Sequence, residues 1–192
     1  MNMTLRSLLD TGAGSAIALS APGRQSMTYD QLRLQVDKIG RQLAGQGLDG
    51  SDRVAIVLPN GPEMAVSFLA VASFMSAAPL NPAYKQSEYE FYLSDLKPAL
   101  VIIEQDSDNP VREAAAALDI PVAEVWVTAD MAAGEFFLFE DEADIVPAGI
   151  EQEALVLHTS GTTSRPKVVP LLQKNILASA RNIAASLELQ IQ

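Results

Sequence analysis

The chain of 192 residues contains no cysteine, one histidine and one tryptophan. Without cysteine, disulfides and thiolate metal sites are excluded, and the composition fits a cytosolic protein. The sequence also lacks an uninterrupted apolar run of about 18 residues, so we expect no membrane span. Its first residues show no apolar segment typical of a secretory signal. With 48% hydrophobic residues, residues 1–192 are expected to form a single globular domain.

Positive charge is scarce and unevenly placed. The chain has 13 Lys and Arg against 24 Asp and Glu, for a net charge of −11, so we expect no nucleic-acid partner. Residues 113–164 contain eleven acids and no Lys or Arg, whereas residues 165–192 contain four cations and one acid. The acidic run at 140–144 is either a solvated loop or a cation site, and such runs favour the loop.

Hydrophobic periodicity predicts an α/β fold. Strands that alternate with helices imply right-handed crossovers and a mostly parallel, doubly wound sheet flanked by helices. The strands are expected at 53–58, 99–103, 122–128 and 154–158, with a short one at 136–139. The helices are expected from Thr28 to about Gly45, and at 63–76, 87–97, 109–118 and 173–187.

Two helix starts and one core residue are also predicted. Thr28 with Gln31, and Ser87 with Glu90, have the spacing of a capping box, in which each end residue bonds the other's backbone N–H. Trp126 comes at the end of a predicted strand, and we expect it in the core.

The segment from His158 to Lys167 is the most informative part of the sequence. It follows the apolar run 154–157 and is rich in small hydroxyl residues, with one glycine and two cations. Small side chains leave backbone N–H groups accessible, hydroxyls add donors, and Arg and Lys add charge. We therefore expect a loop that holds polyphosphate, with a plain solvated loop as the alternative. The Walker spacing Gly-x-x-x-x-Gly-Lys-[Ser/Thr] is absent, which argues against a P-loop NTPase.

The order Thr-Ser-Gly-Thr-Thr-(x)3-Lys over residues 159–167 resembles the phosphate-binding signature of the adenylate-forming (AMP-binding) enzymes. Residues 54–63 resemble the family's first core strand and its next turn. Residues 78–95 resemble the acyl-CoA synthetases of the 4-coumarate-CoA ligase-like branch, and His158 together with 164–167 resembles the oxalyl-CoA synthetases. The resemblance covers about residues 28–187 and implies the first part of the family's large N-terminal domain.

The family resemblance implies a ligase reaction. A carboxylic acid attacks the α-phosphorus of ATP to give an acyl-adenylate, and coenzyme A then takes the acyl group, with Mg²⁺ assisting the first step. The sequence leaves oxalate, aryl acids and fatty acids all open as the acid. His158 either lies beside the substrate or α-phosphate, or is a hydrogen-bonded histidine at a strand end, and the tyrosines at 84–92 are expected to pack rather than line an acyl pocket. The residues expected to bind the cofactor are Thr159, Ser160, Gly161, Thr162, Thr163, Ser164 and Lys167, with His158 and Arg165 as further candidates.

Two features depart from the family pattern. Val168 stands where the family usually has glycine; a valine is strained there if the position has a positive φ and suits it if the backbone is extended. The chain also ends at Gln192, before the segments that supply the family's adenylation lysine and Mg²⁺-binding glutamate. We therefore expect an N-terminal portion with no catalytic residues and no turnover of its own. The alternative is a non-catalytic nucleotide-binding or partner-binding domain, and an incomplete sheet edge would favour self-association.

Overall fold

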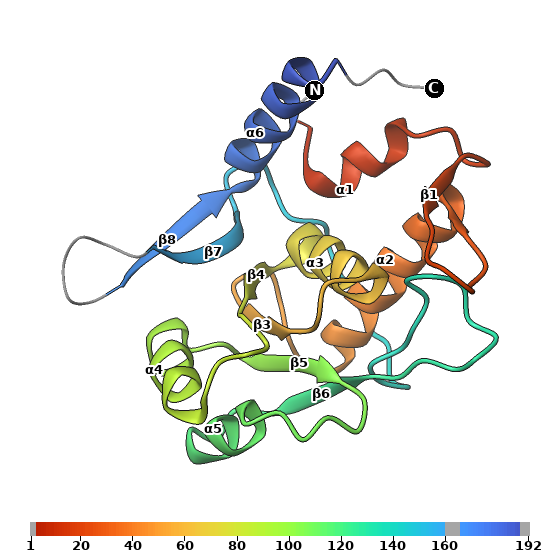
Figure 1. Ribbon diagram of the computed structural model, residues 1–192. Coiled ribbons are helices and arrows are strands. Elements are labelled where there is room, and N and C mark those ends of the chain that lie inside the picture. Colours follow the sequence, from red (N-terminus) through yellow and green to blue (C-terminus); the bar gives the residue numbers. More distant parts are fainter. Residues whose placement is uncertain (1–2, 160–165, 189–192) are drawn as a thin grey trace.

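A computed structural model describes residues 3–159 and 166–188 of the chain. Strands and helices alternate along most of this length (Figure 1). The strands are β1 (Ile17–Leu19), β2 (Met27–Thr28), β3 (Arg53–Val57), β4 (Ser76–Pro79), β5 (Leu100–Glu104), β6 (Val122–Val125), β7 (Glu153–Thr159) and β8 (Lys167–Leu172). The helices are α1 (Leu5–Leu8), the 3-10 helix η1 (Leu9–Thr11), α2 (Tyr29–Gly45), α3 (Pro62–Phe74), α4 (Gln86–Leu96), α5 (Val111–Ala117) and α6 (Gln173–Ser186).

Six strands form one sheet in the order β6-β5-β3-β4-β7-β8, and β1 pairs with β2 in a separate antiparallel ribbon. Strands β3 to β7 are parallel to their neighbours, and β8 runs antiparallel to β7. The predicted mostly parallel α/β fold is therefore confirmed. Because the chain moves from β3 to β4 in one direction and from β4 to β5 in the other, right-handed crossovers place α3 and α4 on opposite faces.

Side chains of the central strands alternate between two cores, as the period of two in a strand requires. Val54 and Ile56 of β3 belong to the cluster that includes residues of α1, α2 and α3. Ala55 and Val57 belong to the cluster that includes residues of α4 and α5. All four are buried, as is typical of a parallel strand covered on both faces. None of the helices within the described residues is long and apolar enough to cross a bilayer.

The central strand β4 was not foreseen from the sequence. Residues up to about 76 were expected to be helical, but α3 ends at Phe74 and Ser76–Pro79 pair with β3. Ala77 and Ala78 are fully buried, although alanine is a poor strand former in isolation. The small side chains fit because helices cover both faces of the sheet at this point, so packing overrides propensity.

Three local expectations were wrong. Residues 136–139 form no strand, since Phe137 makes only a single bridge to Trp126. Trp126 lies beyond β6 and is 41% exposed, stacked on Phe137 instead of buried in the core. The helix after β4 begins at Gln86, where Glu88 accepts a hydrogen bond from the Lys85 backbone N–H, so Ser87 is not its cap. The capping box at Thr28 and Gln31 is confirmed.

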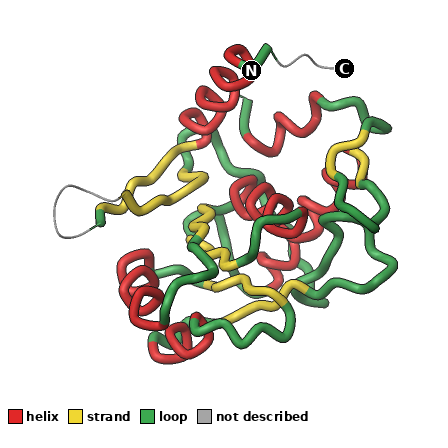
Figure 2. Tube along the Cα trace, viewed as in Figure 1, coloured by secondary structure: helices red, strands yellow, loops and turns green. Residues whose placement is uncertain are grey.

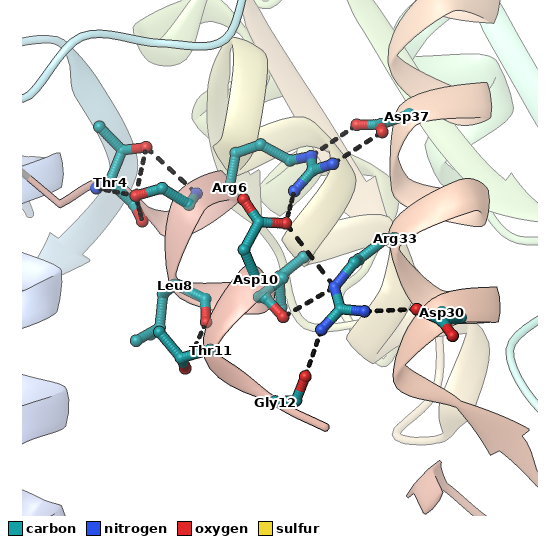
Figure 3. A network of polar contacts seen from close by, with 11 residues as sticks. Thr4, Arg6, Leu8, Asp10, Thr11, Gly12, Asp30, Arg33 and Asp37 are labelled. Carbon is teal, nitrogen blue, oxygen red and sulfur yellow. Dashed lines mark hydrogen bonds and ion pairs between the residues drawn. The ribbon is translucent and has the colours of Figure 1, made fainter. Parts of the chain in front are cut away.

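The N-terminal segment is held to α2 by two arginines (Figure 3). The Arg6 guanidinium donates to both oxygens of Asp37, at 2.6 and 2.8 Å, and to Asp10 at 2.9 Å. These carboxylates, Asp37 foremost, raise the pKa of Arg6. Arg33 pairs with Asp30 at 2.6 Å and donates to the carbonyl of Leu9. The first helix is thereby fixed beside the body of the domain.

A buried side-chain amide joins three helices. Gln173, at the start of α6, is fully buried. Its Oε1 accepts from the Leu5 N–H at 2.9 Å, and its Nε2 donates to the Ala72 carbonyl at 2.5 Å. The Leu5 N–H lies in the first turn of α1 and the Ala72 carbonyl in the last turn of α3, where backbone groups have no partner within their own helix. Gln173 therefore satisfies an unpaired group at the end of each helix.

Replacing Gln173 by leucine should lower the free energy of unfolding by about 3 kcal/mol, because two buried backbone groups lose their partners. Urea unfolding followed by circular dichroism would measure the change. The control is Gln86→Leu, at an exposed position whose amide bonds only the Glu90 side chain, where we expect about 0.5 kcal/mol or less. Equal effects at the two positions would contradict the bridging role.

The departure at Val168 is resolved by the geometry of β8. Val168 pairs with His158 in the ladder between β7 and β8, so its backbone is extended. It is half-buried and packs against the cluster that includes α4 and α5. A β-branched residue suits this position.

Restoring glycine at this position should therefore destabilise the chain. Val168→Gly removes side-chain packing and adds backbone entropy to the unfolded state, at a cost of about 1.5 kcal/mol. Val168→Ala keeps the Cβ and should fall between the wild type and the glycine variant in urea unfolding. A glycine variant more stable than the wild type would indicate strain at Val168 and refute this interpretation.

Candidate functional site

The carboxyl end of β7 carries the start of the predicted phosphate loop. Residues Thr159 and Lys167 are Cα partners at the last position of the ladder between β7 and β8, and both side chains are exposed. β4 pairs with β7 only near its beginning, through Ala77 and Leu155. The end of β7 therefore extends past β4 with β8 beside it (Figure 2). The two ends of the predicted loop are brought together at the edge where parallel strands end.

Six of the nine predicted ligand-binding residues lie outside the described residues. They are Ser160, Gly161, Thr162, Thr163, Ser164 and Arg165. The structure places the other three: His158 and Thr159 are the last two residues of β7, and Lys167 is the first of β8. The phosphate-binding loop therefore stays a prediction, and the structure locates the strand residues on either side of it.

His158 is held by two side chains of α4. Its Nε2 lies 3.1 Å from an Asp95 carboxylate oxygen, and its ring meets the Tyr92 ring edge-on, with centroids 4.7 Å apart. Only 8% of the histidine side chain is exposed. A buried imidazole needs a hydrogen-bond partner, and here it has one. This geometry supports the interpretation of His158 as a hydrogen-bonded strand-end histidine, and a direct contact with ligand stays a prediction.

The aromatic residues beside His158 pack on one another. Tyr84 stacks on Tyr92 with centroids 4.9 Å apart, and meets Tyr89 edge-on at 5.8 Å. Burial, with a contribution from Tyr92, raises the pKa of Tyr84 to about 12. The hydroxyl of Tyr89 donates to the Asn81 carbonyl at 2.9 Å. These contacts favour the packing role over an acyl pocket. They also connect the loop after β4 to the end of β7.

Sequence reasoning missed Asp95 and Tyr92 as neighbours of the site. Their spacing of three on α4 places them on one face of the helix, which periodicity can show. This face meets the end of β7 because β4, which precedes α4 in the chain, lies next to β7 in the sheet. The contact therefore depends on the order of the strands.

A cavity lies elsewhere along the carboxyl ends of the parallel strands. A cavity of about 590 Å³ opens at the carboxyl ends of β3, β5 and β6, where Arg24 and Glu63 form an ion pair. Glu104 and Asp106 also line it, and their exposed carboxylates would repel a polyphosphate. These carboxylates make the cavity a poor place for the phosphates.

The acidic run at 140–144 gives no sign of a metal site. Its side chains are exposed, and Glu142 accepts from Arg41 at 2.8 Å. Among the residues that the structure describes, no group of three or more histidine or acidic side chains is arranged to hold a metal ion.

The chain is similar to a known enzyme family and to individual proteins. The AMP-binding enzyme family matches residues 10–191. The chain is 38% identical over 177 residues to an oxalate–CoA ligase of Arabidopsis thaliana, an alignment that covers 88% of this chain and 34% of that protein. It is 37% identical over 199 residues to the probable CoA ligase CCL9 of Humulus lupulus, covering 95% of this chain and 37% of that protein. The chain thus spans about a third of the length of these relatives.

Solved structures share the fold. Apo MatB from Rhodopseudomonas palustris superposes with a TM-score of 0.77 at 22% identity, over 96% of this chain and 38% of that one. The O-succinylbenzoate coenzyme A synthetase MenE from Bacillus subtilis, in complex with ATP and magnesium ion, gives 0.77 at 21% identity, over 97% and 47%. These structures share the fold of the chain. The match over residues 10–191 shows that the chain belongs to the AMP-binding enzyme family.

Proposed function

We propose that this chain is the N-terminal portion of an ATP-dependent, AMP-forming acid–CoA ligase. The observation that carries the proposal is the pairing of Thr159 with Lys167 at the end of β7, which flanks the family's phosphate signature. In the whole enzyme, a carboxylate oxygen attacks the α-phosphorus of ATP and pyrophosphate leaves. The thiol sulfur of coenzyme A then attacks the acyl carbon, and AMP leaves with the electron pair of the broken C–O bond.

The part of this chain in the reaction is to bind the triphosphate tail. An anionic acid must approach a polyanion, so cationic and N–H groups around the β- and γ-phosphates lower the barrier. Lys167 supplies a point charge, and Thr159 a hydroxyl and a backbone group, from strands held in register. A single donor placed in this way is worth about 3 kcal/mol in the transition state.

Magnesium would enter with the nucleotide. Bound Mg²⁺ neutralises phosphate charge and stabilises the leaving pyrophosphate. In the part of the chain that the structure describes, no group of three or more histidine or acidic side chains is arranged to hold the ion.

The relatives bear on which carboxylic acid the whole enzyme would activate. The oxalate–CoA ligase of Arabidopsis thaliana supports a small carboxylic acid, while the long-chain-fatty-acid–CoA ligase FadD13 of Mycobacterium tuberculosis, 29% identical over 167 residues, shows how widely the relatives differ. The tyrosines near His158 are occupied by contacts with one another.

We propose that adenylation needs residues outside this chain, and we expect the isolated chain to be inactive. Exchange of labelled pyrophosphate into ATP, tested with oxalate, an aryl acid and a fatty acid, should stay at the level without protein. Exchange that depends on this chain and on one of the acids would contradict the assignment of the catalytic groups elsewhere.

Binding of Mg·ATP tests the role of Lys167. Lys167→Ala should weaken binding by about tenfold, because a charge-assisted contact with phosphate is lost. Isothermal titration of the 192-residue chain would measure it. The control is Lys174→Ala, which removes an exposed cation that pairs with Glu151 before the start of β7, at the other end of that strand from Thr159, and should leave the affinity unchanged. Equal affinities of the wild type and Lys167→Ala would remove this residue from the site.

A partner-binding role is the second candidate, favoured by the position of β8 at the end of the sheet order. An edge strand can pair with a second copy of the chain. Pro170 in the middle of β8 has no N–H to donate, which disfavours a continuous ladder across this edge. Sedimentation that shows only monomer at high concentration would argue against self-association.

A further inference from the structure

The end of β7 has a second attachment besides β8. Beyond its pairing with β4, the strand is held to α4 through the 3.1 Å contact between His158 and Asp95 and the ring contact with Tyr92. The Tyr92 ring in turn stacks on Tyr84 in the loop after β4. The end of β7, helix α4 and the loop after β4 are therefore joined through His158 and Tyr92.

Helix stability alone does not favour a carboxylate at position 95. Asp95 is the second-to-last residue of α4, where the partial negative charge of the helix end disfavours an anion. Its side chain is 24% exposed, so water does not fully screen that repulsion. A carboxylate in this place gains from the nearby ring N–H, which must find an acceptor once the imidazole is buried.

We propose that Asp95 is a positioning residue for nucleotide binding, acting through His158; the inference rests on the function proposed above. The Nε2–H donates to Asp95 and fixes both the ring and the backbone of the last residues of β7. Thr159 and Lys167 then meet the triphosphate from a strand end whose freedom is already restricted, which reduces the entropy lost on binding. Asp95 thus restricts the end of β7 by way of His158.

A direct contact between His158 and the nucleotide is the competing explanation. One ring nitrogen is already engaged by Asp95, and the side chain is 92% covered by protein, because only 8% of it is exposed. Both facts favour positioning over contact, and a double-mutant cycle separates the two.

Titration of the 192-residue chain with Mg·ATP is the first test. Asp95→Ala should weaken binding by about fivefold to tenfold, a change typical of a single lost interaction. Asp95→Asn should stay within about threefold of the wild type, since its amide oxygen still accepts from the ring N–H. The matched control is Glu90→Ala, on the same helix, where the carboxylate accepts from Gln86; its affinity should not change.

The same substitution in a second background shows whether the effect passes through the imidazole. His158→Phe keeps an aromatic ring beside Tyr92 and removes both ring nitrogens. In this background Asp95→Ala should change the affinity less than about twofold, because the two residues are then no longer coupled. An equally large effect in both backgrounds would overturn the inference, since Asp95 would then act by another route.

The ring itself gives a readout that general destabilisation would not move. The chain has one histidine, so ¹⁵N-histidine labelling yields a single set of ring signals. The Nε2–H proton should be protected from exchange in the wild type and in Asp95→Asn. In Asp95→Ala this protection should be lost, although urea unfolding still shows a folded protein. An unprotected ring N–H in the wild type would overturn the inference. A wild-type chain that binds no Mg·ATP would refute the nucleotide site itself, whereas tight binding unaffected by Asp95→Ala would refute only the positioning role.

Discussion

The pairing of β7 with β8 is the constraint on which the site depends. Residues 160–166 connect Thr159 to Lys167, and Thr159 and Lys167 are partners across an antiparallel ladder. Whatever conformation the connecting residues adopt, they start and finish within one interstrand spacing of each other. The register places Thr159 and Lys167 opposite each other at the edge where the parallel strands end. Open α/β sheets bind ligands at this edge.

The register of β7 is fixed at both of its ends. At its beginning, Glu153 accepts from the Arg53 guanidinium of β3 at 2.8 and 3.1 Å, across the intervening strand β4. Burial raises the pKa of Glu153, but the hydrogen bonds from Arg53 and Ser76 and the positive charge of Arg53 together outweigh it, so the pKa lies below its usual value and the carboxylate stays charged at neutral pH. At the other end, His158 meets Asp95 of α4. Charge and hydrogen bonding therefore hold a strand that β4 pairs with at one point only.

The sequence was a good guide wherever local chemistry decides the outcome. β3 and β5 coincide with apolar runs rich in β-branched residues, β7 coincides with the apolar run at 154–157, and Thr28 caps α2 as its spacing predicts. Failures occurred where tertiary packing decides. Residues Ala77 and Ala78 form a central strand because neighbours cover both faces, and Trp126 stays 41% exposed although it follows a strand. The helix at 173–187 was predicted from its periodicity, yet Ile183 of α6 is 54% exposed, because periodicity shows that an apolar face exists and not what covers it.

The candidate site also has features that local sequence predicts and features that depend on tertiary packing. Its donors can be read from the sequence, because a run of small hydroxyl residues, glycine and cations has the chemistry that phosphate requires. Its supports cannot, because Asp95 and His158 are separated by 63 residues and meet only when α4 crosses from β4 to β5 beneath the sheet. The valine at 168 shows the same dependence: its strain or comfort was undecided until the ladder placed it opposite His158 in extended backbone. A phosphate signature therefore specifies what a loop can bind, while the strand order specifies how firmly the loop is held.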